Sequence, residues 1–163
     1  MKQRILALLL AAGLCLGLIT AAPALAFSDV SGEELSEAVE VLSGLGIVSG
    51  YSDGSYHPDD ALTRAQFCKL AILTEGHGDQ AKGSAYRTRF SDVPGGGCAA
   101  PYINLACEEG LVAGYGDGRF GPDDPVTVGQ AVTVVLRLLG YTAEEIGPFW
   151  PEDYLNKAGA LGL

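Results

Sequence analysis

The stretch GIVSGYSDGSYHPDDALTRAQ, Gly46–Gln66, is written twice in this chain, and the rest of the sequence is organised around it. Its second copy, GLVAGYGDGRFGPDDPVTVGQ, is Gly110–Gln130, 64 positions later. In the numbering of the first copy, the residues common to both are Gly46, Val48, Gly50, Tyr51, Asp53, Gly54, Pro58, Asp59, Asp60, Thr63 and Gln66. Agreement of this length in order and spacing indicates a duplicated structural unit.

Each copy ends with the start of a predicted helix. Thr63 and Gln66, and likewise Thr127 and Gln130, have the spacing of a capping box. In that motif the threonine hydroxyl accepts a hydrogen bond from an amide of the first turn, and the glutamine side chain reaches back to the threonine amide. Upstream, the Asp-Gly dipeptide at Asp53 predicts a turn. The unit is therefore a glycine-rich loop that leads into a capped helix.

The N-terminal residues predict a secretory signal. Lys2 and Arg4 precede an apolar run from Ile5 to Ile19, and the small-residue site ALA follows at residues 24–26. The apolar run is shorter than the ~20 residues that span a bilayer. We therefore expect residues 1–26 to be a signal peptide, with no transmembrane segment left after cleavage.

The charge of the chain limits the partners that it can bind. The whole sequence has 10 Lys and Arg against 20 Asp and Glu. Removing Lys2 and Arg4 with the signal leaves 8 against 20, a net charge of −12 for the mature chain. Such a surface repels nucleic acid and anionic lipid, so a bound anion needs a local site. A nucleic-acid partner is not expected.

The first repeat covers residues 27–74. Its first helix is predicted at Gly32–Leu45, after a capping box that runs from Ser31 to Glu34. Its second helix is predicted at Arg64–Leu73. Because this second helix is apolar nearly all round, we expect it to be buried and to form the core of the fold.

The remaining chain holds a linker and further repeats. Residues 75–89 are polar and glycine-rich without periodicity, which predicts a flexible linker. Residues 90–141 form the second repeat, with its second helix at Val128–Leu139, and 142–163 match the start of a truncated third repeat. That repeat would leave apolar side chains poorly covered, so association with other repeats or chains is expected. These side chains are Leu155, Leu161 and Leu163.

The tandem pattern FSDV, helix, GxxxGYxDGxFxPDDxxT, helix closely resembles the S-layer homology (SLH) domain family. FSDV stands at residues 27–30 and 90–93, and the loop pattern at the two copies described above. The resemblance implies a mainly α fold, in which tandem helix-loop-helix repeats pack as a pseudo-threefold helical bundle. It also implies that the protein is anchored at the cell wall or cell surface by non-covalent binding of secondary cell wall polysaccharide, often pyruvylated, or another peptidoglycan-linked glycan.

Arg64 is the leading candidate for the binding residue. It matches the family's arginine that faces the acidic group of the sugar, whereas the second copy has Val128 there. Independently, Arg64 begins a helix, where unpaired amides and the helix dipole favour an anion, and a guanidinium can hold a carboxylate through two hydrogen bonds. We hypothesise that Arg64, with Tyr51, Thr63 and Gln66, lines a groove for an acidic saccharide.

Each candidate also has a structural alternative. Arg64 could instead pair with Asp59 or Asp60, and capping alone explains Thr63 and Gln66. The other candidate ligand contacts carry similar alternatives: helix bracing for the two aspartates, packing for the aromatic residues and capping for the glutamine. They are Asp29, Asp92, Tyr115, Trp150 and Gln130.

Other classes of function receive less support from the residues. The acidic turns offer one acid each before the glycine, unlike a calcium-binding EF-hand loop. His77 has no Cys or second His nearby, so neither a metal site nor a cofactor is predicted, and Cys68 and Cys107 are expected to be small buried residues. Catalytic motifs are not found, so an enzyme is not expected. The alternative to a glycan-binding anchor is an extracellular structural or protein–protein interaction module.

Overall fold

The computed structural model describes residues 27–83 and 88–163, so the predicted signal peptide lies outside the described residues. The described chain is mainly helical, which confirms the predicted fold class. Its only strand-like pairing is an isolated bridge between Thr63 and Pro125. The helices are α2 (Glu33–Gly44), α3 (Arg64–Thr74), α4 (Gly78–Gly83), α5 (Ala100–Glu108), α6 (Val128–Leu138), α7 (Ala143–Ile146) and α8 (Glu152–Leu161).

The predicted capping boxes begin α3 and α6. At Thr63 and at Thr127, both hydrogen bonds of the capping box are present. The threonine hydroxyl accepts from the amide of the glutamine three residues on, and the glutamine side chain accepts from the threonine amide. The first helix differs from the prediction. Gly32 is its N-cap residue, with φ 91°, and no side chain caps it, so the capping box expected from Ser31 to Glu34 is wrong.

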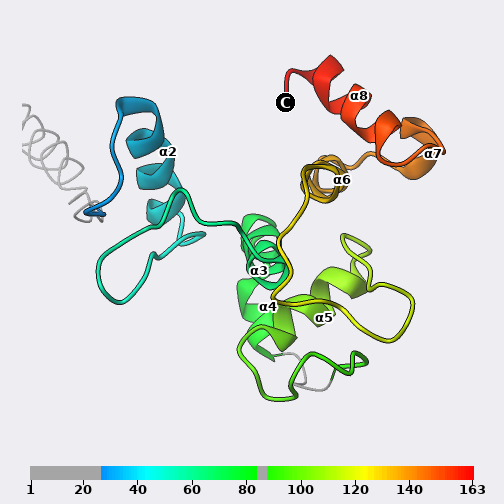
Figure 1. Ribbon diagram of the computed structural model, residues 1–163, viewed down its shortest axis with the longest axis horizontal. Coiled ribbons are helices and arrows are strands. Elements are labelled where there is room, and N and C mark those ends of the chain that lie inside the picture. Colours follow the sequence, from blue (N-terminus) through cyan, green and yellow to red (C-terminus); the bar gives the residue numbers. More distant parts are fainter. Residues whose placement is uncertain (1–26, 84–87) are drawn as a thin grey trace, which may run out of the picture.

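Helices of consecutive repeats pack against each other (Figure 1). The second helix of repeat 1, α3, packs on the first helix of repeat 2, α5, and α6 of repeat 2 packs in the same way on α8. We call these pairs the α3–α5 lobe and the α6–α8 lobe. The lobes meet where α3 contacts α6. The α3–α5 lobe is therefore built from helices of both repeat 1 and repeat 2.

The core lies in the α3–α5 lobe. From α3 it takes Cys68, Ala71 and Ile72, as expected for a helix that is apolar nearly all round. Burial raises the pKa of the Cys68 thiol to about 12, which keeps this cysteine a neutral packing residue. The other core members come mainly from repeat 2 and include Val93, Ala100, Ile103, Leu105, Ala106, Leu111, Phe120 and Val134.

The segment between the repeats is partly helical. Residues 78–83, predicted to belong to a flexible linker, form α4, which packs on α3 and α5. Ala81 is fully buried in the core. The expectation of a flexible linker is wrong for this part of the chain, because the buried side chain of Ala81 holds the segment against α3 and α5.

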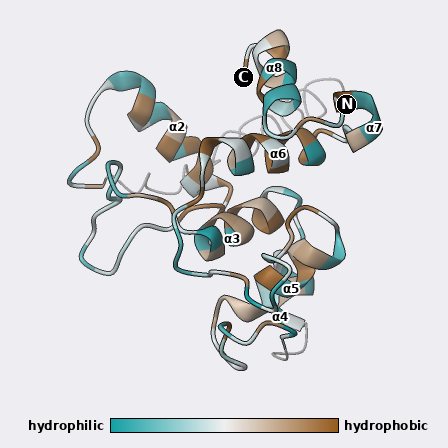
Figure 2. Cartoon of the chain, turned by 45° about the vertical axis from the view of Figure 1, so that its right-hand side comes forward, coloured by the Kyte–Doolittle hydropathy of each residue, from teal (hydrophilic) through white to brown (hydrophobic). Residues whose placement is uncertain are grey.

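α2 stands apart from the other helices (Figure 1). Within the described chain it packs against none of them, and Val39 is its only buried residue. Hydrophobic residues are visible along α2 in Figure 2, and Val41 and Leu45 are 54% and 69% exposed. The apolar residues of α8 that we expected to be poorly covered, Leu155 and Leu161, are 40% and 42% exposed.

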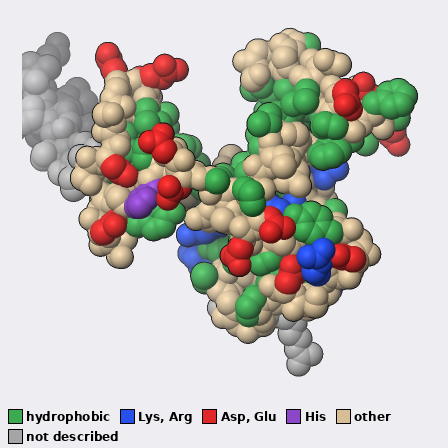
Figure 3. All heavy atoms as spheres, in the orientation of Figure 1, with side chains coloured by type: hydrophobic (Ala, Val, Ile, Leu, Met, Phe, Trp, Pro, Cys, Tyr) green, Lys and Arg blue, Asp and Glu red, His purple; other side chains and the backbone are tan. Residues whose placement is uncertain are grey.

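The surface agrees with an acidic exported protein. Asp and Glu side chains are spread over all parts of the face drawn in Figure 3. Among the helices of residues 27–83 and 88–163, none combines the length and apolar character needed to cross a bilayer.

Candidate functional site

The duplicated loops form two equivalent clefts. The first, the Tyr51 cleft, has a volume of about 370 Å³ and is lined by the loop of repeat 1 together with Gln66, Lys69 and Leu70 of α3. The second, the Tyr115 cleft, has a volume of about 220 Å³ and is lined by the loop of repeat 2 and by α6. Most lining positions of one cleft correspond to those of the other at the 64-residue spacing.

Arg64 belongs to the Tyr115 cleft, although it comes from repeat 1. Its side chain is only 7% exposed, and its guanidinium lies 4.9 Å from the ring centroid of Tyr115 and 4.5 Å from that of Phe120. Nε donates to the carbonyl oxygen of Phe120, and Nη2 donates to that of Ala113, both at 2.9 Å. The arginine therefore joins two repeats while one side of it lines the cleft.

The structure excludes the ion pair considered for Arg64 and changes the predicted groove. Asp60 pairs with His57 instead, and the Arg64 guanidinium is held by carbonyl groups of repeat 2. Tyr51 and Gln66, which we grouped with Arg64, line the Tyr51 cleft. A single groove that contains Arg64, Tyr51, Thr63 and Gln66 is therefore wrong, because Arg64 lies in the other cleft and Thr63, which caps α3, lines neither of the two.

The start of α3 is also not available to an anion. The amide of Arg64 donates to the carbonyl oxygen of Asp124 at 2.9 Å, and that of Ala65 donates to Pro122 at 3.0 Å. The amide of Gln66 donates to the hydroxyl of Thr63 in the capping box. The anion-binding role predicted for these first-turn amides is therefore wrong, and only the side chain of Arg64 remains a candidate for binding an anion.

Aromatic and polar residues from three segments complete the Tyr115 cleft. Tyr115 is 45% exposed and donates from its hydroxyl to Asp124 Oδ2 at 2.7 Å; this hydrogen bond raises the pKa of Tyr115. Trp150, 54% exposed, donates from Nε1 to Thr133 Oγ1 at 2.9 Å, so it both packs on α6 and lines the cleft. Gln130 lines the cleft beside its capping role.

Sequence analysis missed Arg137. This residue lies in the last turn of α6, and its Nη1 donates to the carbonyl oxygens of Gly110 and Leu111 at 3.0 and 2.9 Å. It lines the Tyr115 cleft, which therefore holds two guanidinium groups. Arg137 is the only charged residue of α6, and this sequence feature could have identified it.

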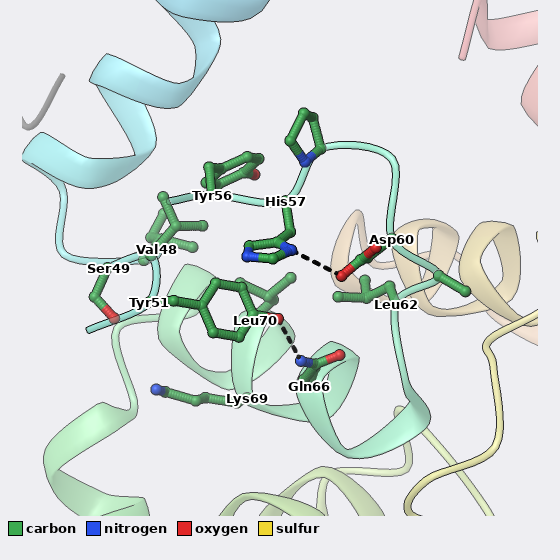
Figure 4. A pocket seen from close by; sticks show the side chains of 14 residues that line it. Val48, Ser49, Tyr51, Tyr56, His57, Asp60, Leu62, Gln66, Lys69 and Leu70 are labelled. Atoms are coloured by element: carbon green, nitrogen blue, oxygen red, sulfur yellow. Dashed lines mark hydrogen bonds and ion pairs between the residues drawn. The ribbon is translucent and has the colours of Figure 1, made fainter. Parts of the chain in front are cut away.

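The Tyr51 cleft has a different set of side chains (Figure 4). The hydroxyl of Tyr51 accepts a hydrogen bond from Gln66 Nε2 at 3.3 Å, and its ring lies edge-on to His57 at 4.7 Å. His57 Nδ1 lies 3.0 Å from Asp60 Oδ2. Tyr51 and Tyr56 correspond to the two rings that enclose Arg64, but within the described residues no cation lies over either of them.

Asp29 and Asp92 each accept hydrogen bonds from backbone amides of the loop of their own repeat. Asp29 accepts hydrogen bonds from the amides of Tyr56 and His57 at 2.8 and 2.7 Å, and Asp92 accepts from Phe120 and Gly121, both at 2.8 Å. The bond from Phe120 is the main reason why the pKa of Asp92 is lowered. Neither aspartate caps a helix or lines a cleft, so each is a positioning residue for the loop of its own repeat.

Comparison with known proteins gives a consistent family assignment. The model of the S-layer homology domain matches residues 26–68 and 89–132. The chain is 34% identical to the "Middle cell wall protein" of Brevibacillus brevis, over 80% of this chain and 12% of that protein. It is 33% identical to the "Surface layer protein" of Brevibacillus choshinensis, over 79% and 12%. It is also 29% identical to the "Cellulosome-anchoring protein" of Acetivibrio thermocellus, over 56% and 21%.

The chain spans only about an eighth of the length of the first two relatives, 12% in each case. These relatives are proteins of the cell wall and the surface layer, which agrees with the location predicted from the sequence. The two matched segments contain both copies of the loop and the helix start that follows each of them. The chain therefore belongs to the S-layer homology domain family.

Proposed function

We propose that the chain is a non-catalytic module that anchors an exported protein to the cell envelope by binding an acidic wall polysaccharide, such as a pyruvylated secondary cell wall polymer. The observation that carries the proposal is the Tyr115 cleft, where two guanidinium groups and two aromatic side chains meet in a protein whose net charge is −10. The names of the relatives, which include a cell wall protein and a cellulosome-anchoring protein, support the same role.

The side chains of this cleft have the chemistry that an acidic sugar requires. Arg64 and Arg137 are fixed by hydrogen bonds to carbonyl groups, so they lose little conformational entropy when a carboxylate binds. Charge-assisted hydrogen bonds from guanidinium to carboxylate are among the strong ones in proteins. Tyr115 and Trp150 offer partly exposed rings beside these cations, against which a sugar ring can pack.

Sedimentation with cell walls tests the proposal. The mature chain is mixed with walls that carry a pyruvylated polymer, and with the same walls after the polymer has been stripped. We expect binding only to the intact walls. Loss of a charge-assisted bond of about 1.5–3 kcal/mol in Arg137→Gln should weaken binding roughly tenfold or more. Lys82→Gln is the matched control, because Lys82 is exposed, pairs with Asp79 and lies outside the lining of this cleft.

The outcome separates two functions. Equal binding by the folded Arg137→Gln and Lys82→Gln variants contradicts a glycan site in the Tyr115 cleft. The second candidate is a module for association between proteins, favoured by the exposed apolar residues of α2 and α8. For that function, sedimentation with walls would require a partner protein and would not depend on the wall polymer.

A further inference from the structure

Three side chains with metal-binding atoms meet at the outer end of the α3–α5 lobe. Nδ1 of His77 lies 2.7 Å from Oε1 of Glu109 and 3.9 Å from Oε2 of Glu75. One ligand atom from each residue can be chosen so that all lie within 4.8 Å of one another. We call these residues the Glu-His-Glu cluster. Sequence analysis predicted no metal role for His77 because no Cys or second His lies near it in the sequence, whereas Glu109 is 32 residues away.

The position of the two glutamates is electrostatically unfavourable. Glu75 is the C-cap residue of α3, and Glu109 is the C-cap residue of α5. The carboxyl end of a helix carries a partial negative charge that favours cations, and here two such ends and two carboxylates meet. One oxygen of each carboxylate lies within 4.8 Å of an oxygen of the other, so the two negative charges repel each other. A positive charge between the two side chains removes this repulsion.

One oxygen of the cluster lacks a partner. Oε2 of Glu109 is buried and accepts no hydrogen bond, while Oε1 of the same carboxylate is bonded to His77. A buried carboxylate oxygen without a donor costs free energy. A cation bound between the three side chains would satisfy this oxygen.

The corresponding place in the second lobe holds neither a carboxylate nor an imidazole. At the 64-residue spacing, Leu139 and Tyr141 of the α6–α8 lobe correspond to Glu75 and His77. Leu161 corresponds to Glu109, because each precedes a left-handed glycine at the end of its helix. All three positions of this second lobe are therefore apolar or aromatic. Carboxylates and an imidazole replace them together in the first lobe, although they are far apart in sequence.

We propose that the Glu-His-Glu cluster binds a divalent transition-metal ion of the zinc type, which ties the end of repeat 1 to the first helix of repeat 2. An imidazole nitrogen with two carboxylates is a donor set that suits Zn²⁺ better than Ca²⁺, which prefers oxygen ligands only. Tetrahedral Zn²⁺ with bonds of about 2.0 Å needs ligand atoms about 3.3 Å apart, within the range of this cluster. The site is independent of the glycan cleft.

Calorimetry and thermal unfolding with Zn²⁺ alone test this proposal. The metal-free mature chain should bind one equivalent of ZnCl₂, and its melting temperature should rise when the zinc ion is bound. It should bind CaCl₂ more weakly than ZnCl₂. Glu109→Gln and His77→Gln should each lower the zinc affinity at least about tenfold. Glu108→Gln, the exposed neighbour, and Cys98→Ser, which removes an exposed thiol, should bind as the parent chain does.

A triple variant keeps the test decisive if single substitutions impair folding. Glu75→Leu, His77→Tyr and Glu109→Leu together install the side chains of the second lobe, and this chain should fold with a melting temperature that Zn²⁺ does not change. The proposal is overturned if the folded parent chain binds no Zn²⁺, if it prefers Ca²⁺, if the triple variant still gains stability from Zn²⁺, or if Cys98→Ser alone abolishes binding.

Discussion

Nε of Arg64 donates a hydrogen bond of 2.9 Å to the carbonyl oxygen of Phe120, 56 residues further along the chain. The same guanidinium lies over the Phe120 ring, so one contact joins the helix start of repeat 1 to the loop of repeat 2. Arg64 is therefore part of the structure between repeats as well as part of the proposed binding cleft.

Arg64→Ala should destabilise the fold strongly. The substitution leaves the carbonyl groups of Phe120 and Ala113 without donors and removes a buried cation from between two rings, so we expect a loss of about 3 kcal/mol in the free energy of unfolding. Urea denaturation measures it. Arg119→Ala, which removes an exposed ion pair, should cost less than about 1 kcal/mol. Equal losses in the two variants would contradict the role of Arg64 between the repeats.

The two capping threonines should contribute similar stability. Thr63→Ala and Thr127→Ala each remove a hydroxyl that caps a helix, and we expect each to cost ~1 kcal/mol by thermal or urea unfolding. Val128→Ala changes an adjacent side chain that is 72% exposed, and it should cost much less. A Thr127→Ala chain as stable as Val128→Ala would mean that the cap contributes little.

Gly114 is required by close packing. A Cβ atom there would overlap the ring of Phe90 and lie 2.8 Å from the carbonyl oxygen of Arg119. We expect Gly114→Ala to cost about 1–3 kcal/mol, the usual range for overpacking. Gly44→Ala is the control, because a Cβ at this helical glycine meets nothing within 4 Å. Circular dichroism melts should show Gly44→Ala at least as stable as the parent chain.

The contribution of Asp92 should depend on pH in a defined direction. Hydrogen bonds from Phe120 and Gly121 lower its pKa in the folded chain below the ordinary value of 3.8. Its stabilising contribution is therefore present above pH 3.8 and is lost as the pH falls through the lowered folded-state pKa. Asp92→Asn should melt below the parent chain at pH 7, and the difference should shrink below pH 3.8. Asp123→Asn, an exposed neighbour of the loop, is the control and should melt as the parent chain does at pH 7.

Local features of the fold could be predicted from sequence because they depend on residues a few positions apart. The capping boxes at Thr63 and Thr127 are confirmed. Gly46 and Gly110, which are equivalent in the two copies, follow the ends of their helices with φ of 71° and 73°. Prediction failed at Ser31, where the neighbouring Gly32 takes the cap position instead. It failed again at 78–83, where contacts with α3 and α5 give a polar segment a helical structure.

Sequence analysis named several of the residues that line the two clefts but not how they are arranged. Tyr115, Gln130, Trp150 and Arg64 do meet in one cleft, whereas Tyr51 and Gln66 lie in another. Which residues share a cleft depends on how α3 and α6 pack against the helices that follow them, and this packing joins residues from different repeats.

The sequence by itself determined that the chain is a tandem helical repeat with capped helix starts, because each of these features is encoded within a few neighbouring residues. Only the tertiary structure decided that Arg64 enters the cleft of the following repeat and that Glu75 and His77 meet Glu109. The reason is that these contacts join residues 32 to 56 positions apart, and they form only when a helix of one repeat packs on a helix of the next.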